Sequence, residues 1–250
     1  MTPRLSIIIA TFNAAKYLNN ALESIVRQKY TDWECVVVDG GSSDSTLDVL
    51  RHYKEIDERI RFITEEDRGI FDAFNKGWKL AKGEWIYYLG SDDVLKEDAF
   101  SNVDFSSMSS SDILYGNIEI QFPDGSVKVV TPKPINFLRY VMIANHQAIL
   151  MKKKVISDLG GFNIDYPISA DFDLTQRAYL CGRQFKYLDK CFARFSYSGL
   201  SSFNSKRKRQ DHLKICIVNR ASKFPKLFHT FFEVKMYLGY LQKKYIKHCL

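Results

Sequence analysis

Four short apolar runs alternate with segments of helical periodicity in the first hundred residues, and this alternation constrains the fold more than any other feature. The runs are rich in β-branched and aromatic residues, whereas the segments between them repeat apolar residues every three or four positions. Strands separated by helices of 10–15 residues form βαβ units and a parallel sheet. We therefore expect strands at residues 5–10, 33–39, 61–64 and 85–89, and helices at 15–28, 44–53 and 70–80.

The next hundred residues are expected to be richer in strands. Runs at 112–120 and 127–130 flank Pro123-Asp124-Gly125, which is typical of a hairpin turn. The whole pattern predicts an α/β fold with a Rossmann-like, mixed but mostly parallel sheet flanked by helices, over residues 1–203 with two halves that meet near residue 100. Further strands are expected at 146–151, 185–188 and 192–197, and helices at 154–159 and 171–180.

The net charge of +7 comes from the C-terminal tail. Residues 203–250 hold 12 Lys and Arg against 2 Asp and Glu, whereas the other 202 residues hold 24 against 27. Basic and aromatic residues near helical spacing predict a basic amphipathic helical tail, at 204–250, on an anionic membrane surface. The alternatives are an apolar face packed on the domain and a solvated basic run at 206–209. Nucleic acid is not an expected partner, because the rest of the chain is acidic and lacks a recognition motif.

The five cysteines are odd in number, scattered, and form no Cys-x-x-Cys pair, which is typical of a protein in a reducing compartment. The first apolar run is too short for a signal peptide, and no window approaches the ~18 uncharged apolar residues of a membrane span. We therefore expect a cytoplasmic protein that is peripheral on a membrane through its tail.

Polar side chains follow three of the expected strands. Thr11 and Asn13 follow the first, Asp39 ends the second, and Asp92 and Asp93 follow the fourth. The carboxyl ends of parallel strands share one edge of a sheet, where α/β folds bind ligands. Adjacent carboxylates repel each other and attract a cation, and oxygen ligands favour Mg²⁺ or Mn²⁺. The alternative for the acidic pair is a solvated turn that caps the next helix.

Asp39 precedes Gly40 and Gly41, and glycines let a backbone approach a ligand closely. A carboxylate here can accept the imide N–H of a uracil. Capping of the next helix is the alternative, but Ser43 and Asp44 are already available as caps, and this favours a ligand role.

The motifs at residues 6–13 (SIIIATFN), 37–44 (VVDGGSSD), 75–77 with 81–83, and 91–93 occur together in this order. Their combination resembles the inverting glycosyltransferases of family 2, which have the GT-A fold. The segments at 67–75, 146–148, 160–162 and 170–173 are similar to the subgroup that builds bacterial surface polysaccharides. The resemblance covers about residues 5–202, and several spaced motifs agree.

The resemblance implies a metal-dependent transfer of one sugar from a nucleotide-sugar, a UDP-sugar, to a hydroxyl of a lipid-diphosphate-linked saccharide. Such a reaction serves the synthesis of O-antigen, capsule or exopolysaccharide at the inner face of the bacterial plasma membrane. By the same resemblance, Thr11 and Asp39 hold the base, and Asp92 contacts the ribose or the donor sugar. Asp93 holds the Mn²⁺ or Mg²⁺ that bridges the diphosphate.

An inverting transfer needs a base for the acceptor hydroxyl. The family places an Asp for this role near the start of a helix, usually after Glu, and Asp171 matches it. Ala170 stands where the Glu is usual, which puts any acceptor contact of that Glu in doubt. The alternative for Asp171 is a first-turn carboxylate favoured by the helix dipole. Asp173 is the rival base, but two residues along a helix it faces elsewhere.

Four further residues and one segment are weaker candidates. Arg68 can pair with the diphosphate, and Asp72 and Asn75 lie three apart on one helix face and can meet the donor sugar. His146 can line the acceptor side or the phosphate region, and residues 199–202 can close over the diphosphate. The alternatives are a solvated charge, an ordinary polar face, a structural histidine and a simple connection.

Three other functions are weighed against sugar transfer. A non-catalytic nucleotide-sugar-binding module or scaffold of the same fold would be expected to lack a key acid. The acids Asp39, Asp92 and Asp93 and the candidate base Asp171 are all present. A nucleotidyltransferase needs a Gly-rich basic loop after the first strand, which residues 10–14 lack. A processive synthase needs membrane spans and a Gln-x-x-Arg-Trp signature, and neither is present.

Overall fold

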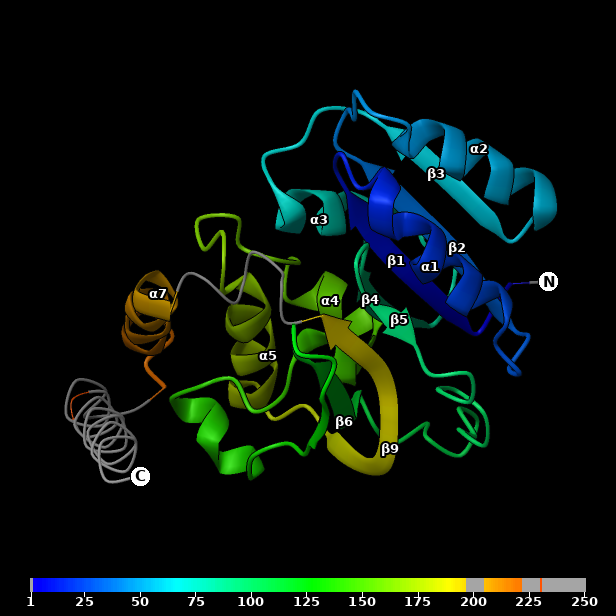
Figure 1. Cartoon of the computed structure of the whole chain (residues 1–250). Helices are drawn as coiled ribbons and strands as arrows, with labels where there is room; N and C mark the ends of the chain where they lie inside the picture. The colour runs from blue at the N-terminus through cyan, green and yellow to red at the C-terminus, as the bar shows by residue number, and fades with distance from the viewer. Residues whose placement is uncertain (1, 197–204, 222–229, 231–250) are drawn as a thin grey trace, which may run out of the picture.

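The structure is a computed structural model that describes residues 2–196, 205–221 and 230. Its N-terminal half consists of parallel strands that alternate with helices (Figure 1). Strand β1 lies between β2 and β4, and β3 pairs with β2, all in parallel. The alternation predicted from the sequence is thus confirmed. The elements are β1 (Leu5–Thr11), α1 (Ala15–Val26), β2 (Trp33–Asp39), α2 (Thr46–Ile56), β3 (Ile60–Thr64), α3 (Ile70–Leu80) and β4 (Trp85–Gly90).

The second half adds antiparallel pairings to the same sheet. β8 is antiparallel to β4 and β6, while β9 runs parallel to β6 and antiparallel to β5. The strand order is β3-β2-β1-β4-β8-β6-β9-β5, with β7 paired to β6 in the expected hairpin. The elements are β5 (Val94–Leu95), β6 (Ile113–Gln121), β7 (Val127–Val130), η1 (Ile135–Arg139), η2 (His146–Ala148), β8 (Ile149–Lys152), α4 (Lys153–Asp158), α5 (Ala170–Leu180), β9 (Phe185–Ser196) and α7 (Ser205–Val218).

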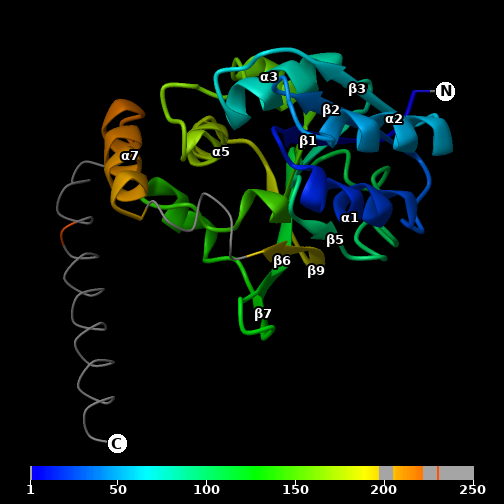
Figure 2. The ribbon, with the colours of Figure 1, turned by 45° about the horizontal axis from the view of Figure 1, so that its top comes forward.

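Helices cover both faces of the sheet, which Figures 1 and 2 show from two directions. Successive side chains of β1 enter opposite cores: Ile7 packs with Leu22 of α1, and Ile8 packs with Phe74 of α3. Burial on both faces explains why β1 is a continuous apolar run and not an alternating one. Gly77 lets α3 approach β1 closely, because a Cβ at this position would overlap the Ile8 side chain.

Two expectations about the later strands were wrong. Residues 146–148 form the 3₁₀ turn η2, and the strand begins only at Ile149. The Gln147 carbonyl accepts a hydrogen bond from the Tyr87 hydroxyl at 2.6 Å, in place of a ladder bond. The two strands expected after residue 185 are one strand, β9, whose pairing with β6 continues through register shifts near Asn117.

The first part of the basic tail packs on the domain. In both views α7 lies beside α5, and the His212 ring lies 4.3 Å from the Phe172 ring (Figures 1 and 2). Ile215 and Cys216 are fully buried, whereas Arg207 is exposed. The aromatic stripe expected beyond residue 221 and the loop at 199–202 lie outside the described residues. Within the described part of the chain, no helix is both long and apolar enough to cross a bilayer.

Candidate active site

The carboxyl ends of three neighbouring strands bring the predicted polar residues to one edge of the sheet. Thr11 at the end of β1 pairs with Asp39 at the end of β2, and Ala10 pairs with Gly90 at the end of β4. The turn Ser91-Asp92-Asp93 follows Gly90 directly. The edge predicted from the strand order is therefore present.

Asp39 organises the loop that follows it. Its carboxylate accepts the backbone N–H groups of Gly41 and Ser42 at 3.2 and 3.0 Å, and the Ser42 and Thr64 hydroxyls at 2.5 and 2.6 Å. The residue is completely buried. The loop's own donors reach both oxygens, three of them at Oδ2, so a contact from Asp39 to a base stays a prediction and would use the free lone pair of Oδ1.

Asn13 joins the loops that follow β1 and β2. Its side-chain oxygen accepts the Ser43 N–H at 2.9 Å, and its own N–H donates to the Ser42 hydroxyl at 2.8 Å. Its φ of 48° is left-handed, a conformation that Asn tolerates better than most residues. Asp44 adds a second tie, since it accepts N–H groups from Thr46 and Ala15 at the starts of α2 and α1.

Asp67 is a functional candidate that the sequence reasoning missed. A Cβ at Gly40 would lie 2.6 Å from its Oδ2, so the carboxylate sits directly on the glycine backbone beside Thr11. Its Oδ1 accepts the Gly69 N–H at 2.7 Å. Among the described residues, the buried Thr11 hydroxyl has no hydrogen-bond partner. The available signal was Gly40, whose missing side chain makes room for Asp67.

The α3 candidates make structural contacts. Asp72 accepts the Arg68 N–H at 3.1 Å, while the Arg68 side chain is 74% exposed. Asn75 donates to the Phe162 carbonyl at 2.8 Å and accepts N–H groups from Phe162 and Trp78 at 2.9 and 3.0 Å. The Asn75 amide thus holds the loop before α5, and its contact with the donor sugar stays a prediction.

The two acids after β4 differ in exposure. Asp93 is 1% exposed, and its carboxylate accepts the Gln147 side-chain N–H at 2.5 Å and the Ser196 N–H at 3.3 Å. Burial, and next the charge of Asp92, raises the pKa of Asp93 to about 7. Burial also raises the pKa of Asp92, which is only partly buried. Both carboxylates approach the Cα of Gly90.

This acidic pair fits a divalent cation that is shared with a diphosphate. A cation beside the pair would stabilise both ionised carboxylates, because burial raises the pKa of each and the charge of Asp92 raises that of Asp93 further. Within the described ranges, no group of three or more His, Cys, Asp or Glu side chains could enclose a metal ion. At phosphate sites Mg²⁺ usually binds one or two carboxylates and completes its coordination with phosphate oxygens and water.

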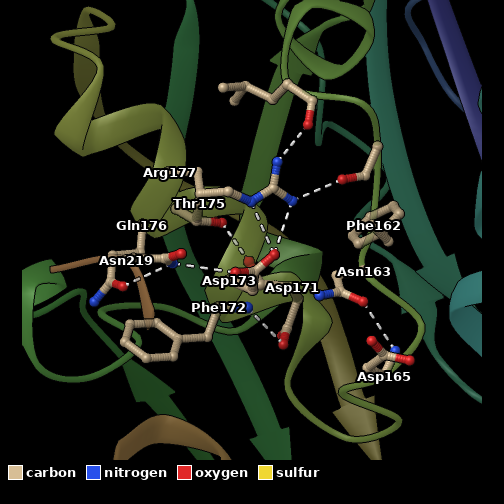
Figure 3. Close-up of polar contacts among 12 residues, drawn as sticks. Phe162, Asn163, Asp165, Asp171, Phe172, Asp173, Thr175, Gln176, Arg177 and Asn219 are labelled. Carbon is tan, nitrogen blue, oxygen red and sulfur yellow. Dashed lines mark hydrogen bonds and ion pairs between the residues drawn. The ribbon is translucent and has the colours of Figure 1, made fainter. Parts of the chain in front are cut away.

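Asp171 lies in the first turn of α5. Its Oδ1 accepts the Phe172 N–H at 2.8 Å (Figure 3). Its Oδ2 lies 3.8 Å from Nδ1 of His146. Both side chains line a small, largely apolar cavity of about 20 Å³. Oδ2 accepts no hydrogen bond from the described residues, and a carboxylate oxygen with a free lone pair in such surroundings has the properties of a general base. The apolar lining includes Ile86, Ile149, Met151, Phe162 and Leu174.

Asp173 faces away from Asp171, as Figure 3 shows. It pairs with Arg177 at 2.8 Å and accepts the Asn219 side-chain N–H at 3.1 Å. The Arg177 guanidinium also donates to the carbonyls of Leu159 and Gly161 at 2.5 and 2.7 Å. Asp173, weighed above as the rival base and a weak acceptor-side candidate, thus connects α5 to Asn219 directly and, through Arg177, to the loop after α4.

Ala170, which stands where the family usually has a Glu and is a weak acceptor-side candidate, is completely buried in the core. Its small side chain packs in the hydrophobic core, where the longer, charged side chain of a Glu could not reach solvent. This residue therefore offers no polar contact to an acceptor.

Residues 6–153 match the family model described as Glycosyl transferase family 2. The chain is 35% identical over 183 residues to a PGL/p-HBAD biosynthesis glycosyltransferase of Mycobacterium bovis, covering 71% of this chain and 70% of that protein. It resembles the crystal structure of S. aureus TarS 1–349 with UDP-GlcNAc, with a TM-score of 0.68, 20% identity, and coverage of 86% of this chain and 66% of that one. The mannosyltransferase PcManGT of Pyrobaculum calidifontis, with GDP-Man and Mn²⁺, gives a TM-score of 0.68, 21% identity, and coverage of 95% and 70%.

Proposed function

The chain belongs to glycosyl transferase family 2 and has the GT-A fold, and on that premise we propose which sugar transfer it carries out. It moves one sugar from a UDP-sugar to a hydroxyl of a lipid-diphosphate-linked saccharide, in the synthesis of a bacterial surface polysaccharide. The observation that carries the proposal is the joint placement of Asp92 and Asp93 at the donor edge and of Asp171 in a cavity, linked through consecutive residues of η2.

The donor nucleotide lies over the ends of β1 and β2. Thr11 offers a buried hydroxyl without a partner among the described residues, and Asp67 presents a carboxylate against Gly40. A carboxylate at this point accepts an imide N–H, and the loop ordered by Asp39 holds the backbone in place. The bound UDP-GlcNAc of TarS supports a UDP-sugar as the donor.

Asp92 and Asp93 would hold the Mn²⁺ or Mg²⁺ ion, and Mn²⁺ in the PcManGT structure supports this assignment. When bound, the cation neutralises charge on the departing nucleoside diphosphate. Asp92 presents the more accessible carboxylate of the two. Asp93 lies deeper, where Gln147 orients it. The exposed guanidinium of Arg68 is available to pair with the diphosphate as the donor enters.

Asp171 is the base. The acceptor hydroxyl oxygen attacks the anomeric carbon while its proton passes to Oδ2 of Asp171. The bond between the anomeric carbon and the diphosphate oxygen breaks with its electron pair on that oxygen. The products are the nucleoside diphosphate and a glycoside of inverted configuration.

The tail brings the site to the lipid-linked acceptor at the inner face of the plasma membrane. Each Lys or Arg near an anionic surface contributes about 1 kcal/mol. Because α7 packs on α5, a deletion should spare it and remove residues 222–250 alone. Loss of binding to vesicles containing anionic lipid is expected, and binding equal to that of the full chain would contradict the membrane role.

The decisive experiment incubates the purified chain with Mn²⁺ and a panel of nucleotide-sugars, with and without a lipid-diphosphate-linked saccharide. Release of the nucleoside diphosphate that depends on the acceptor is expected for a UDP-sugar, and Asp171→Asn should abolish it. A non-catalytic binding module, the alternative function, would bind the donor without turnover at any acceptor concentration.

A further inference from the structure

Two consecutive residues of η2 contact the two ends of the proposed reaction. Gln147 donates its side-chain N–H to Asp93 at 2.5 Å, and His146 lies 3.8 Å from Asp171. We propose that His146 and Gln147 are positioning residues, and that η2 sets the donor-side acid and the base in a fixed mutual position. This inference rests on the proposed function and adds two residues to it.

Gln147 is fixed at both its backbone and its side chain. Its carbonyl accepts the Tyr87 hydroxyl at 2.6 Å, and Tyr87 is completely buried in β4. Its amide is 3% exposed, so the bond to Asp93 forms away from bulk solvent. A hydrogen bond from a buried donor to a carboxylate is both strong and directional. Gln147 therefore orients the Asp93 carboxylate before any cation or diphosphate arrives.

His146 occupies the cavity beside the base. Its ring contacts the Phe74 ring edge-on at 5.9 Å between centroids, which fixes the ring plane. Among the described residues, its buried Nε2 has no hydrogen-bond partner. Burial lowers the pKa of His146, with Asp171 opposing and Lys208 adding to the shift, so the ring is neutral near pH 7. A neutral imidazole that carries its proton on Nδ1 can donate to Oδ2 of Asp171.

The separation of 3.8 Å is slightly longer than a hydrogen bond. Catalytic hydrogen bonds often shorten only when the substrate is bound. Oδ1 of Asp171 is already held by the Phe172 N–H, so a bond from His146 to Oδ2 would fix the plane of the carboxylate. The remaining lone pair of Oδ2 would then point at one place in the cavity, where the acceptor hydroxyl must lie.

The first arm of the test measures transfer by His146→Leu, His146→Gln and, as a matched control, the exposed His52→Gln. We expect kcat of His146→Leu to fall by about 10²-fold, the lower end for a group that aids proton transfer, with the Kd for UDP unchanged. His146→Gln keeps a donor and should recover most of the rate. An unchanged kcat in His146→Leu would overturn the assignment, as would equal losses in both variants accompanied by equally lowered melting temperatures.

The second arm does not depend on turnover. Crystal structures of the two His146 variants should show the Asp171 carboxylate rotated in His146→Leu and unchanged in His146→Gln; an unchanged carboxylate in both overturns the role of His146. Titration of Gln147→Met with UDP and Mn²⁺ should show Mn²⁺-dependent UDP binding weakened about tenfold, the effect of losing ~1.4 kcal/mol. Unchanged binding overturns the role of Gln147. If the natural chain itself transfers no sugar, the proposed function fails, and these structures and titrations still decide the inference.

Discussion

Asn75 of α3 donates to the carbonyl of Phe162 and accepts its N–H, so a single amide closes two hydrogen bonds with one backbone residue 87 positions further along the chain. Gly161 makes this approach possible, because a Cβ there would lie 2.5 Å from the Asn75 oxygen. The loop that leads to the proposed base is thereby attached to the helix behind the nucleotide site.

Asn75→Ala should lower the free energy of unfolding by about 2 kcal/mol, because it leaves two buried backbone groups without partners. Transfer should fall as well, since the loop before Asp171 loses its attachment. Urea unfolding measures the first effect. Asn20→Ala, at an exposed position of α1, is the matched control and should leave stability nearly unchanged. Stability in Asn75→Ala equal to that of the control would contradict the structural role.

Asp171→Asn and Asp173→Asn should separate chemistry from stability. Asp171→Asn should reduce transfer by about 10³-fold, within the range for a lost general base, while stability and UDP binding stay unchanged. Asp173→Asn leaves the partly buried Arg177 without its counter-charge and should cost about 2–3 kcal/mol of stability. Thermal unfolding and transfer assays on both variants test these two expectations. Near-normal transfer by Asp171→Asn would show that Asp171 is not the base.

Glu34 should make stability depend on pH in the acid range. It is nearly buried and accepts hydrogen bonds from the Ser6 hydroxyl, the Lys82 N–H and the Arg61 guanidinium. Burial raises its pKa, but these bonds outweigh burial and lower the pKa overall. The stabilisation is therefore complete above the unfolded pKa of about 4.3 and is lost as the pH falls through the lower folded value.

Glu34→Gln should accordingly be less stable than the natural chain at pH 7, and this difference should shrink between pH 5 and pH 3. Urea unfolding across this range provides the measurement. The exposed Glu55→Gln is the control and should show no such change. A difference that stays constant with pH would show that Glu34 does not contribute through its charge.

Asp67→Ala should weaken UDP binding by about tenfold, because a hydrogen bond to a charged group contributes about 1.5–3 kcal/mol. Asp39→Asn should instead lower stability, because it disturbs the loop that Asp39 orders. Titration calorimetry with UDP separates the two effects. Glu66→Ala, next to Asp67 and exposed, is the control. A larger loss of UDP affinity in Asp39→Asn than in Asp67→Ala would instead support a contact between Asp39 and the base.

The sequence predicted the parallel half well because its signals are local. Its three inner strands, β1, β2 and β4, are buried on both faces and read as mostly apolar runs. The strand pairs of the second half depend on contacts far apart in the chain. The two-residue β5 has too few residues to show a pattern, and η2 became a turn because Tyr87 and Asp93 bind Gln147.

For the site, the sequence correctly predicted that polar residues lie at the carboxyl edge of the sheet. It did not show which of their side chains make hydrogen bonds within the protein. In the sequence, Asp39, Asn75 and Asp173 have the properties of ligand-binding residues. In the structure, each side chain makes hydrogen bonds to other parts of the protein. Asp67 was missed for the converse reason. Its carboxylate becomes noticeable only when β3 and β2 place it against Gly40.

Strand β4 lies where the two halves of the sheet meet, with the parallel strand β1 on one side and the antiparallel strand β8 on the other. During synthesis the βαβ half is complete before β8 exists, and Gln147 follows Tyr87 by 60 residues. Until then the outer edge of β4 carries unpaired backbone groups, which are a template for aggregation. The nascent chain can therefore form its nucleotide-binding half early, yet the acids after β4 are oriented only when the last strands dock.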